Sequence, residues 1–553
     1  MSDSGNTSRN TGPRASRPNI VLILVDDMGY SDIGCYGSEI RTPNVDRLAA
    51  EGIRFTQMYN CARCCPSRAS LLTGLYPHQA GVGHMVGDSG LDGYRGFLQQ
   101  NCVTIAEVLA RAGYRTFMSG KWHVGGYYPP NQPDTWRPGD EGHPTPIQRG
   151  FEEHYGMLGG GGSYFDPPSL HHNDIRVVIP GDEDYYFTDA ISDNAVRMIG
   201  EAGRGDAPFF LYVGYTAPHW PLHALPEDIA RYEGKYGGGW DAVRTARHEE
   251  LKGMGILNPK WNISPRDEQA PDWSDVPPKL KTWQNLRMAV YAAQIDRMDQ
   301  GVGRICARLR ELGIEDDTLV MFMSDNGGCA EFLAEDVGRP QPHRYNIPTR
   351  DGRPMHVGNT PALRPGPDDT FMSYDLPWAN ASNTPFRLYK HWVHEGGIAT
   401  PFVVHWPKAA TRGGIRHQPM HFIDVMATCL DAAGARYPEE HNGQPVTPLE
   451  GESLLPALGS DAWSRERPIF WEHEGNRAVR LGHWKLVSKY PGGWELYDMN
   501  EDRTELNDLA PGNAATVDRL ARMYDEWAER VGVLPWEQVT GAPEKTSRPG
   551  MRA

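Results

Sequence analysis

Side chains that can bind a metal ion or move a proton follow four apolar runs of strand length. They are Asp26 and Asp27 after NIVLILV, Lys121 and His123 after YRTFMSG, His219 after PFFLYVGYTAP, and Asp325 and Asn326 after TLVMFMS. Each group by itself is more typical of a turn or a helix cap than of a functional site. In open parallel sheets, however, ligands bind outside the carboxyl ends of the strands. We therefore expect these side chains to form one site.

The residue types suit a divalent metal ion beside a tetrahedral anion. Carboxylate and amide oxygens are hard ligands, which favour Ca²⁺ or Mg²⁺ over Zn²⁺. Lysine and histidine side chains beside such an ion would add positive charge and groups that transfer protons. Together they predict a site for a sulfate or phosphate ester.

Three cysteines lie within five residues, at Cys61, Cys64 and Cys65. The pattern Cys61-Ala-Arg-Cys64 is a C-x-x-C, which occurs in zinc sites and in dithiol redox sites. No second Cys or His pair stands at the spacing of a structural zinc site, and a redox dithiol would leave the strand-end residues unexplained. Buried packing as small apolar side chains suits Cys61 and Cys65, so that Cys64 needs a separate interpretation.

The residues that follow Cys64 form a specific pattern. The stretch Cys64–Gly74 reads CCPSRASLLTG and matches C-x-P-S-R-x-x-x-x-T-G at all its fixed positions. With about 5% usage of each residue type, a chain of this length would contain such a match by chance about once in 10⁵. The proline favours a helix start just after Cys64, where free N–H groups and the helix dipole attract an anion.

This pattern resembles the signature of the type I sulfatases of the alkaline phosphatase superfamily. The resemblance covers nearly the whole chain and includes NIVLILVDDMGYSDIGCYG, SGKWHVG, APHWP, SDNGG, KHWVHEGG, RAVRLGHWKLV and WELYDMNEDRTELNDLA. The segments QRGFEEHYGMLGGGGSYFDPPSL and DLPWANASNTPFRLYKHWVHEGG resemble a bacterial arylsulfatase-like branch. The resemblance implies hydrolysis of aryl or carbohydrate sulfate monoesters to an alcohol and inorganic sulfate.

The resemblance also implies a modified nucleophile and a calcium ion. In this family the first cysteine of the motif, here Cys64, is oxidised to formylglycine, whose aldehyde hydrates to a gem-diol. One hydroxyl attacks sulfur, and the other then expels sulfate. The implied partners are a small-molecule or saccharide sulfate ester and a formylglycine-generating enzyme for maturation. The implied Ca²⁺ ligands, beside the modified Cys64, are Asp26, Asp27, Asp325 and Asn326.

The family's motifs imply roles for further side chains. Arg68 is implied to stabilise the hydrate, and Lys121 and Lys390 to hold sulfate oxygens. Asp325 is implied to accept the proton of the attacking hydroxyl, and His123 that of the second hydroxyl. His219 is implied to protonate the leaving oxygen. Lys390 is identified by its position five residues before Glu395 in KHWVHEGG. His78 and His84 are expected to be structural.

Two other functions stay open on the sequence. A phosphonate monoester or phosphodiester hydrolase would share the superfamily, the formylglycine and much of the site, although the full C-x-P-S-R motif and the arylsulfatase-like segments favour sulfate. A non-catalytic binding protein would keep the fold, but the complete set of ligands, cations and nucleophile argues against it. The chain departs from the family at Cys65, where a small polar residue is frequent. If conversion of Cys64 is incomplete, this neighbouring thiol could form other oxidised species.

Composition and charge restrict the partners. The 553 residues carry a net charge of −16, which disfavours nucleic acid as the main partner but permits a local cationic pocket. No apolar run approaches the roughly 18 residues of a membrane-spanning helix, and the polar start lacks the apolar core of a signal peptide. Eight cysteines are too sparse for a disulfide framework. We expect a cytoplasmic protein without a nucleic-acid or membrane partner, or a periplasmic one if a signal was removed.

The elements that must position the site alternate between apolar strands and amphipathic helices. This alternation predicts an α/β fold with a large, mostly parallel sheet sandwiched by helices, which the resemblance identifies as alkaline-phosphatase-like. Local signals include Thr42 as an N-cap and a capping box at Thr104 and Glu107. The short alternating runs RPIFWEH, RAVRLGHWKLVSK and GWELYDM, followed by AATVDRLARMYDEWAERVG, predict a small C-terminal antiparallel sheet with one helix.

The predicted division of the chain has four parts. They are a disordered tail at 1–18, a catalytic α/β domain at 19–455, a C-terminal α+β subdomain at 456–540 and a flexible tail at 541–553. Two stretches with little periodicity, 220–282 and 327–386, are expected to form the rim of the site. Their aromatic residues could stack on a sugar or aryl ring, or could equally pack within the loops. These aromatic residues are Trp240, Trp261, Trp273, Tyr345, Tyr374 and Trp378.

Overall fold

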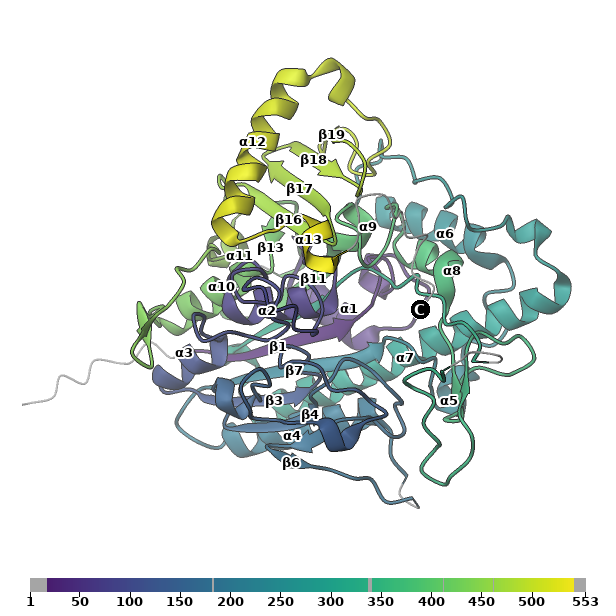
Figure 1. Cartoon of the computed structure of the whole chain (residues 1–553), viewed down its shortest axis with the longest axis horizontal. Helices are drawn as coiled ribbons and strands as arrows, with labels where there is room; N and C mark the ends of the chain where they lie inside the picture. Colours follow the sequence, from purple (N-terminus) through teal and green to yellow (C-terminus); the bar gives the residue numbers. More distant parts are fainter. Residues whose placement is uncertain (1–16, 182–183, 337–340, 411, 461, 542–553) are drawn as a thin grey trace, which may run out of the picture.

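A computed structural model describes residues 17–541 except 182–183, 337–340, 411 and 461. Most of the two tails expected at 1–18 and 541–553 therefore lies outside the described residues. One large sheet with helices around it forms the body of the protein, and a smaller C-terminal sheet stands against it (Figure 1). Within the described ranges, no helix is long and apolar enough to cross a bilayer.

The large sheet has a central group of parallel strands. Its strands are β1 Asn19–Asp26, β2 Ile53–Tyr59, β3 Arg115–Gly120, β4 Glu153–Met157, β5 Leu170–His172, β6 Ile175–Arg176, β7 Phe209–Pro218, β8 Thr318–Ser324, β11 Ala399–His405, β12 Gly414–Arg416 and β13 Met420–His421. The order is β12-β2-β11-β8-β1-β7-β3-β4-β5-β6, with β13 also paired to β2. Strands β8, β1, β7, β3 and β4 run parallel, whereas β11 is antiparallel to both its neighbours. The predicted mostly parallel sheet is confirmed.

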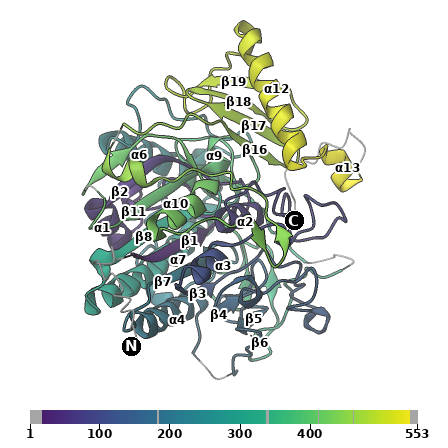
Figure 2. The ribbon, with the colours of Figure 1, turned by 90° about the vertical axis from the view of Figure 1, so that its left-hand side faces the viewer.

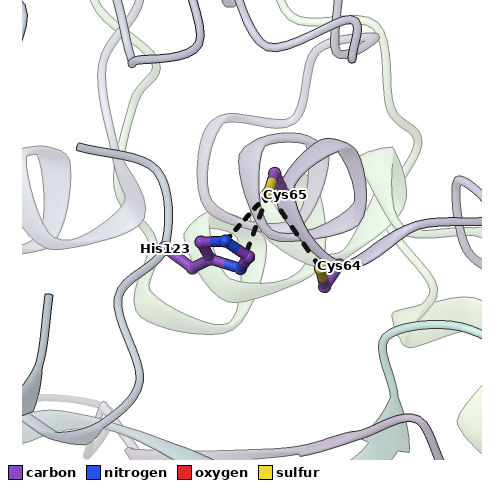
Figure 3. Close-up of side chains that lie close together, drawn as sticks. All are labelled: Cys64, Cys65 and His123. Atoms are coloured by element: carbon purple, nitrogen blue, oxygen red, sulfur yellow. Dashed lines mark hydrogen bonds between the residues drawn. The ribbon is translucent and has the colours of Figure 1, made fainter. Parts of the chain in front are cut away.

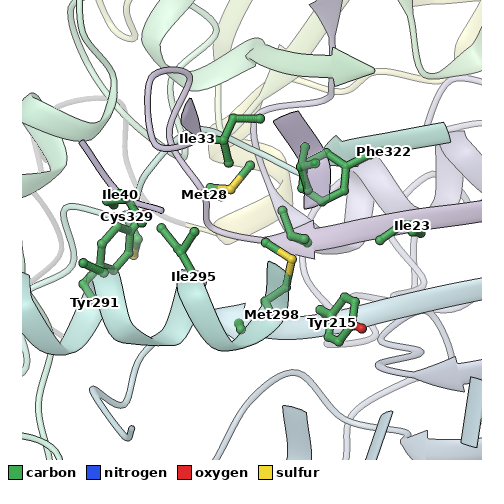
Figure 4. Packing of buried hydrophobic residues seen from close by; sticks show 14 of the residues in the cluster. Ile23, Met28, Ile33, Ile40, Tyr215, Tyr291, Ile295, Met298, Phe322 and Cys329 are labelled. Atoms are coloured by element: carbon green, nitrogen blue, oxygen red, sulfur yellow. The ribbon is translucent and has the colours of Figure 1, made fainter. Parts of the chain in front are cut away.

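Helices cover both faces of this sheet. One face carries α1 Pro43–Glu51, α4 Phe187–Ala202 and α7 Pro278–Glu311, and the other carries α2 Cys64–Thr73, α3 Ile105–Arg111 and α10 Ile423–Ala433. Alternate side chains of β1 enter two different cores, because successive residues of a strand point to opposite faces. Ile23 belongs to one core with Met298 of α7 (Figure 4). Leu22 belongs to the other, with Leu71 of α2 and Val425 of α10.

Local sequence signals set several helix starts. The hydroxyl of Thr104 accepts a hydrogen bond from the N–H of Glu107, and the Glu107 carboxylate accepts one from the N–H of Thr104. This reciprocal pair is the predicted capping box at the start of α3. Thr42 stands at the predicted N-cap position of α1. Its hydroxyl instead accepts from the N–H of Gly34 and donates to Asp46, so it fixes the turn that precedes the helix.

The two stretches expected to form the rim of the site contain helices that their weak periodicity did not indicate, and both stretches line the cavity described below. The helices are α5 Pro226–Ile229, α6 Gly239–Gly253 and the first turn of α7 in the first stretch, and α8 Asp375–Ser382 in the second. Their aromatic side chains pack on one another. The Trp240 ring lies 4.7 Å from that of Trp273 and 5.5 Å from that of Trp378, and Tyr374 stacks on Tyr291 at 4.2 Å. These rings therefore pack within the rim, and Trp240 also lines the cavity described below.

The C-terminal part forms the predicted antiparallel sheet and helix. Its strands are β16 Ile469–His473, β17 Asn476–Leu481, β18 Trp484–Ser488 and β19 Glu495–Asp498, in that order. Helix α12 (Ala514–Val531) lies along this sheet (Figure 2) and buries Leu520 and Trp527 against Val479 and Leu486.

The remaining short elements lie in several parts of the chain. They are β9 His356–Val357, β10 Thr370–Phe371, β14 Glu440–His441, β15 Gln444–Pro445, α9 Glu395–Ile398, α11 Leu455–Gly459 and α13 Trp536–Thr540. The domain boundary after residue 455 stays a prediction.

A buried network of charges joins the small sheet to the large one. Glu395, the first residue of α9, accepts hydrogen bonds from Nζ of Lys485 (2.9 Å), Nε of Arg503 (2.8 Å) and the hydroxyl of Tyr59 (3.0 Å). Lys485 also lies 2.8 Å from Glu505. Burial would raise the pKa of Glu395, but Lys485 and Arg503 outweigh burial and lower it to about 2. Glu395 is therefore ionised in the folded protein at neutral pH.

Candidate active site

Four neighbouring strands deliver polar side chains to one edge of the large sheet. Strands β8, β1, β7 and β3 are adjacent in that order and parallel, so their carboxyl ends share an edge. Helix α2 and the loop before α9 complete the site. The structure brings together every residue that the sequence predicted for it: Asp26, Asp27, Cys64, Arg68, Lys121, His123, His219, Asp325, Asn326 and Lys390, none more than 6% exposed.

Two buried lysines face two buried carboxylates. Nζ of Lys121 lies 2.5 Å from Oδ2 of Asp26, and Nζ of Lys390 lies 2.9 Å from Oδ2 of Asp27. Burial lowers the pKa of both lysines, but the facing carboxylates outweigh burial, so both pKa values lie above the usual value. Both ammonium groups are therefore charged at neutral pH.

Arg68 fixes Asp325 from the first turns of α2. Its Nε and Nη2 atoms donate to Oδ2 of Asp325 at 3.0 and 2.7 Å. Its Nη1 donates to the carbonyl of Lys121 at 2.9 Å and to the hydroxyl of Tyr212 at 3.2 Å. Burial and the Asp26 carboxylate raise the pKa of Asp325 well above its usual value. The two carboxylates therefore repel each other, a situation that a bound cation would relieve.

Two buried oxygen atoms of this site lack a donor. Oδ1 of Asp26 and Oδ1 of Asn326 have no hydrogen-bond partner within the part of the chain that the structure describes. Nδ2 of Asn326 donates to Oδ1 of Asp27 at 2.7 Å, which leaves the amide oxygen for another partner. Buried oxygens without a partner are unfavourable, and a hard divalent cation would pair with both. The donor set therefore fits Ca²⁺.

Cys64 is the first residue of α2, a helix whose residues are all buried. Its Sγ lies 4.0 Å from Sγ of Cys65, which lies 3.5 and 3.3 Å from the two ring nitrogens of His123 (Figure 3). The Cys65 thiol lowers the pKa of Cys64 well below its usual value, against burial and with help from Lys121 and His123. Cys65 therefore borders the site, which corrects the expectation that it serves only as a small packing residue.

The other cysteine of the C-x-x-C pattern has a different environment. Sγ of Cys61 donates to Oγ of Ser70 at 3.3 Å and lies 3.7 Å from Nε2 of His421. Burial raises the pKa of Cys61 to about 12. A thiol with so high a pKa is a poor zinc ligand and a poor redox nucleophile. All eight cysteines are free thiols, and the packing interpretation of Cys61 fits its surroundings.

His123 can accept a proton at neutral pH. Burial and the Lys121 ammonium lower its pKa to about 4, so the imidazole is neutral at pH 7. Its backbone φ of 58° lies in the left-handed region, which turns the chain sharply directly after β3.

His219 is oriented by its own loop. Its Nδ1 donates to the carbonyl of Trp220 at 2.6 Å. Its Nε2 lies 3.4 Å from Oδ2 of Asp27 and 3.5 Å from Nζ of Lys390. The carbonyl fixes the ring, so Nε2 is the atom that can exchange a proton with a ligand in the site.

Glu331 is a charged residue in the wall of the site that was not predicted from the sequence. Its carboxylate lies 2.9 Å from Nη2 of Arg63 and 4.0 Å from Nζ of Lys390, and it accepts a hydrogen bond from Nε1 of Trp220 at 2.8 Å. Burial would raise the pKa of Glu331, but Lys390 and Arg63 outweigh burial and hold it well below its usual value. Its position six residues after Asp325 was a signal available in the sequence.

The glycine run 159–162 was also missed as part of the site. A Cβ atom on Gly160 would lie 2.3 Å from Nε2 of His123, and one on Gly161 would lie 3.1 Å from Cε1 of His219. The run of four glycines is visible in the sequence. Only the fold shows that its backbone passes directly against both histidines.

A cavity of about 1050 Å³ lies beside Lys390. Its wall carries charged and aromatic groups, which include Arg63, Glu331, His391, Trp392 and Lys489. Ligand pockets commonly have volumes of about 300–1,000 Å³, so this cavity has room for a sugar or an aryl group attached to the anion.

Comparison with known proteins identifies the family to which this chain is similar. A family model described as Sulfatase matches residues 18–435, and one described as N-sulphoglucosamine sulphohydrolase, C-terminal, matches residues 386–528. The chain is 30% identical to an uncharacterised sulfatase of Schizosaccharomyces pombe, over 95% of this chain and 96% of the relative. It is 33% identical to an arylsulfatase of Klebsiella aerogenes, over 79% and 91% of the two chains. The crystal structure of Ps i-CgsB in complex with k-i-k-neocarrahexaose is 28% identical, with a TM-score of 0.63 over 93% of both chains.

Proposed function

The chain belongs to the sulfatase family and is a sulfuric ester hydrolase, and on that premise we propose that it hydrolyses aryl or carbohydrate sulfate monoesters with a formylglycine made from Cys64 and a bound Ca²⁺. The observation that carries this proposal is the position of Cys64. It lies at the start of α2, close enough to Asp26, Asp325, Lys121 and Lys390 to interact electrostatically with each. The helix start favours an anion there through free N–H groups and the helix dipole.

Formylglycine at position 64 would supply a hydrated aldehyde whose hydroxyl is the nucleophile, and Ca²⁺ would supply positive charge next to a sulfate oxygen. A formylglycine-generating enzyme is the proposed maturation partner. Asp26, Asp27, Asp325 and Asn326 are the side chains that would hold the ion. The buried, unpartnered Oδ1 atoms of Asp26 and Asn326 support this assignment.

Lys121 and Lys390 would hold the sulfate oxygens. A sulfate monoester carries one negative charge, and its leaving oxygen gains charge as the S–O bond breaks. Both ammonium groups are buried and fixed by carboxylates, so they need little rearrangement to meet that charge. Removing one such contact typically costs about 3–4 kcal/mol of transition-state stabilisation.

Three side chains would handle protons. Asp325 would accept the proton of the attacking hydroxyl, and Nε2 of His219 would donate a proton to the leaving oxygen. His123, which is neutral at pH 7, would accept the proton of the second hydroxyl during sulfate release. A positioned proton donor or acceptor contributes roughly 10²- to 10⁴-fold to the rate.

Arg68 would stabilise the hydrated form of the modified residue. It is fully buried and four residues beyond Cys64 on α2, one helical turn away. Its hydrogen bonds to Asp325, to the Lys121 carbonyl and to Tyr212 keep the guanidinium in place.

The leaving group would occupy the cavity beside Lys390. A carbohydrate is supported by the solved relative whose crystals hold k-i-k-neocarrahexaose. An aryl group is supported by the Klebsiella aerogenes arylsulfatase.

The test compares two activated esters. Protein co-expressed with a formylglycine-generating enzyme is assayed for nitrophenol release from a nitrophenyl sulfate and from a nitrophenyl phosphonate monoester, with Cys64→Ala as background. Sulfate turnover that dominates and disappears in Cys64→Ala is the expected result. Dominant phosphonate turnover would refute the choice of sulfate while keeping the nucleophile. No turnover of either ester, by protein that mass spectrometry shows to carry the aldehyde, would refute the mechanism.

A further inference from the structure

A second cluster of side chains that could bind a metal ion lies apart from the proposed Ca²⁺ ligands, and two of its residues, His391 and Glu474, also line the cavity beside Lys390. His84, His473 and Glu474 offer ligand atoms that all lie within 4.8 Å of one another. Nδ1 of His391 lies 2.8 Å from Oε2 of the same Glu474 carboxylate. These four residues come from three separate parts of the chain, namely the loop after α2, the loop before α9 and the hairpin between β16 and β17.

The distances within the cluster resemble those around a tetrahedral metal ion. Nδ1 of His84 lies 3.4 Å and Nε2 of His473 lies 3.7 Å from Oε1 of Glu474. With Zn–N and Zn–O bonds of about 2.0–2.2 Å, neighbouring ligands of a tetrahedral zinc lie roughly 3.3–3.6 Å apart. The distances from the two histidines to Glu474 are therefore close to those of a tetrahedral site, and the histidine nitrogens lie within 4.8 Å of each other. Imidazole nitrogens with one carboxylate favour Zn²⁺ and similar transition metals over Ca²⁺.

His473 is a buried polar side chain that has no hydrogen bond. The side chain is fully buried, yet neither ring nitrogen forms a hydrogen bond to any residue in the described ranges. Buried polar groups are nearly always paired, because an unpaired one loses its bonds to water without replacement. A metal ion bound at one nitrogen would supply the missing interaction.

Two residues of the cluster have unfavourable backbone conformations. Glu474 has a φ of 50° and His391 a φ of 92°, in the left-handed region that favours glycine. Glu474 and Gly475 form the two-residue turn of a hairpin, a position where Asn-Gly is preferred. Backbone strain of this kind concentrates where a side chain has a function that local preference does not serve.

The position of the cluster connects two parts of the molecule. His391 directly follows Lys390, and its N–H donates to the carbonyl of Ala62 at 2.7 Å. The ring of Trp536 in α13 lies against that of His84, with centroids 4.8 Å apart. An ion in the cluster would therefore fasten the loop that carries Lys390 to the C-terminal subdomain.

We propose that His84, His473 and Glu474 form a binding site for Zn²⁺ or a similar transition-metal ion, with His391 holding the Glu474 carboxylate in place. This site is separate from the Ca²⁺ ligands of the proposed function and involves neither the nucleophile nor the sulfate. Its role is structural, because it joins the Lys390 loop to the hairpin between β16 and β17.

The test is a spectroscopic titration of the Cys64→Ala protein, which has no thiol at position 64. The protein is saturated with Ca²⁺ and titrated with Co²⁺, whose tetrahedral complexes absorb strongly in the visible range, and Zn²⁺ is then added to displace the cobalt. We expect one Co²⁺ per chain, displaced by Zn²⁺, and a thermal midpoint that rises with added Zn²⁺. Loss of a residue that only hydrogen-bonds a metal ligand lowers metal affinity about 10–100-fold. His84→Gln and His473→Gln each remove a proposed ligand, so each should weaken Co²⁺ binding at least as much.

The matched control is His172→Gln. His172 is an exposed histidine that lies 2.9 Å from Glu153, so its removal deletes a His–Glu pair elsewhere and should leave Co²⁺ binding unchanged. His84 lies in a partly exposed loop, so His84→Gln keeps the test valid if His473→Gln does not fold. The absence of a tetrahedral cobalt spectrum at millimolar Co²⁺, or equal binding in His84→Gln and the parent, would overturn the proposal. Neither readout depends on turnover, so the outcome is independent of the ester assay.

Discussion

Replacement of Lys121 by methionine would separate the catalytic from the structural contribution of one buried charge. Nζ of Lys121 lies 2.5 Å from Oδ2 of Asp26, and both side chains are fully buried. Methionine keeps a flexible apolar chain of similar length but removes the ammonium group. Its effects on activity and stability should therefore be mainly electrostatic.

The expected losses follow from what the ammonium group contacts. If Lys121 holds a sulfate oxygen, its loss should cost about 3–4 kcal/mol in the transition state and lower kcat/KM about 10²- to 10³-fold. In Ca²⁺-free buffer the Asp26 carboxylate would be left buried without its lysine, which typically costs about 3–5 kcal/mol of stability. Arg68, 3.9 Å from Asp26, should keep the cost near the lower limit. Added Ca²⁺ should restore part of the stability, because Asp26 is a proposed ligand.

The assay measures kcat/KM on a nitrophenyl sulfate and unfolding midpoints with and without Ca²⁺. Lys260→Met is the matched control, because Nζ of Lys260 lies 2.7 Å from Glu501 while the two side chains are 43% and 67% exposed. An exposed pair contributes only about 0–1 kcal/mol, so this variant should behave like the wild type. If Lys121→Met loses less than about tenfold in kcat/KM, Lys121 does not hold the reacting sulfate. If it unfolds like Lys260→Met in Ca²⁺-free buffer, the argument from the buried charge is wrong.

Three further changes test other features. Cys65→Ala removes a thiol beside His123 and should lower kcat about 3- to 10-fold, the worth of one neutral hydrogen bond, with recovery in Cys65→Ser. Gly160→Ala would place a Cβ 2.3 Å from Nε2 of His123, so it should lower kcat about 10²-fold with little change in KM. The control Gly87→Ala should have no effect on kcat, because its Cβ would meet no atom within 4 Å. Glu395→Gln should destabilise the protein by on the order of 3 kcal/mol at pH 7, since a folded-state pKa of about 2 against an ordinary 4.5 stabilises the fold above pH 4.5. That advantage is lost as the pH falls through about 2, so a gap in thermal midpoint that stays constant from pH 7 to pH 2 would contradict the reasoning.

The strand-end residues of the site were predictable because one rule of sheet geometry applies to them. Asp26, Lys121, His219 and Asp325 stand up to 299 residues apart in the chain, since the last follows β8 and the first ends β1. Parallel strands nevertheless deliver their carboxyl ends to one edge, and β8, β1, β7 and β3 are neighbours. Glu331 does not end a strand; its position six residues after Asp325 places it near this edge, but only the path of its loop brings it against Arg63.

Helix α6 was not predicted because its buried face is partly charged. Its buried side chains include Trp240, Arg244, Arg247 and Leu251, which recur at helical spacing. Two of these four are arginines, so the apolar periodicity that indicates an amphipathic helix is broken. The arginines can be buried because each finds a partner outside the helix: Arg247 lies 2.6 Å from Asp32, and Arg244 donates to the carbonyl of Ser264 at 2.6 Å. Such a partner is a property of the fold and leaves no local signal.

The fold was easier to predict than the fine geometry of the site, because the fold leaves local sequence signals and that geometry depends on tertiary contacts. Gly74, with a φ of 68°, ends α2 where local preference asks for glycine. Asp27, His123 and His391 have φ values of 65°, 58° and 92°, although none is glycine and each such conformation costs roughly 1–2 kcal/mol. Local preference therefore marks where elements end, but it opposes the conformations of these three residues. Only the surrounding tertiary contacts can hold them there, and this is why their side-chain directions could not be read from the sequence.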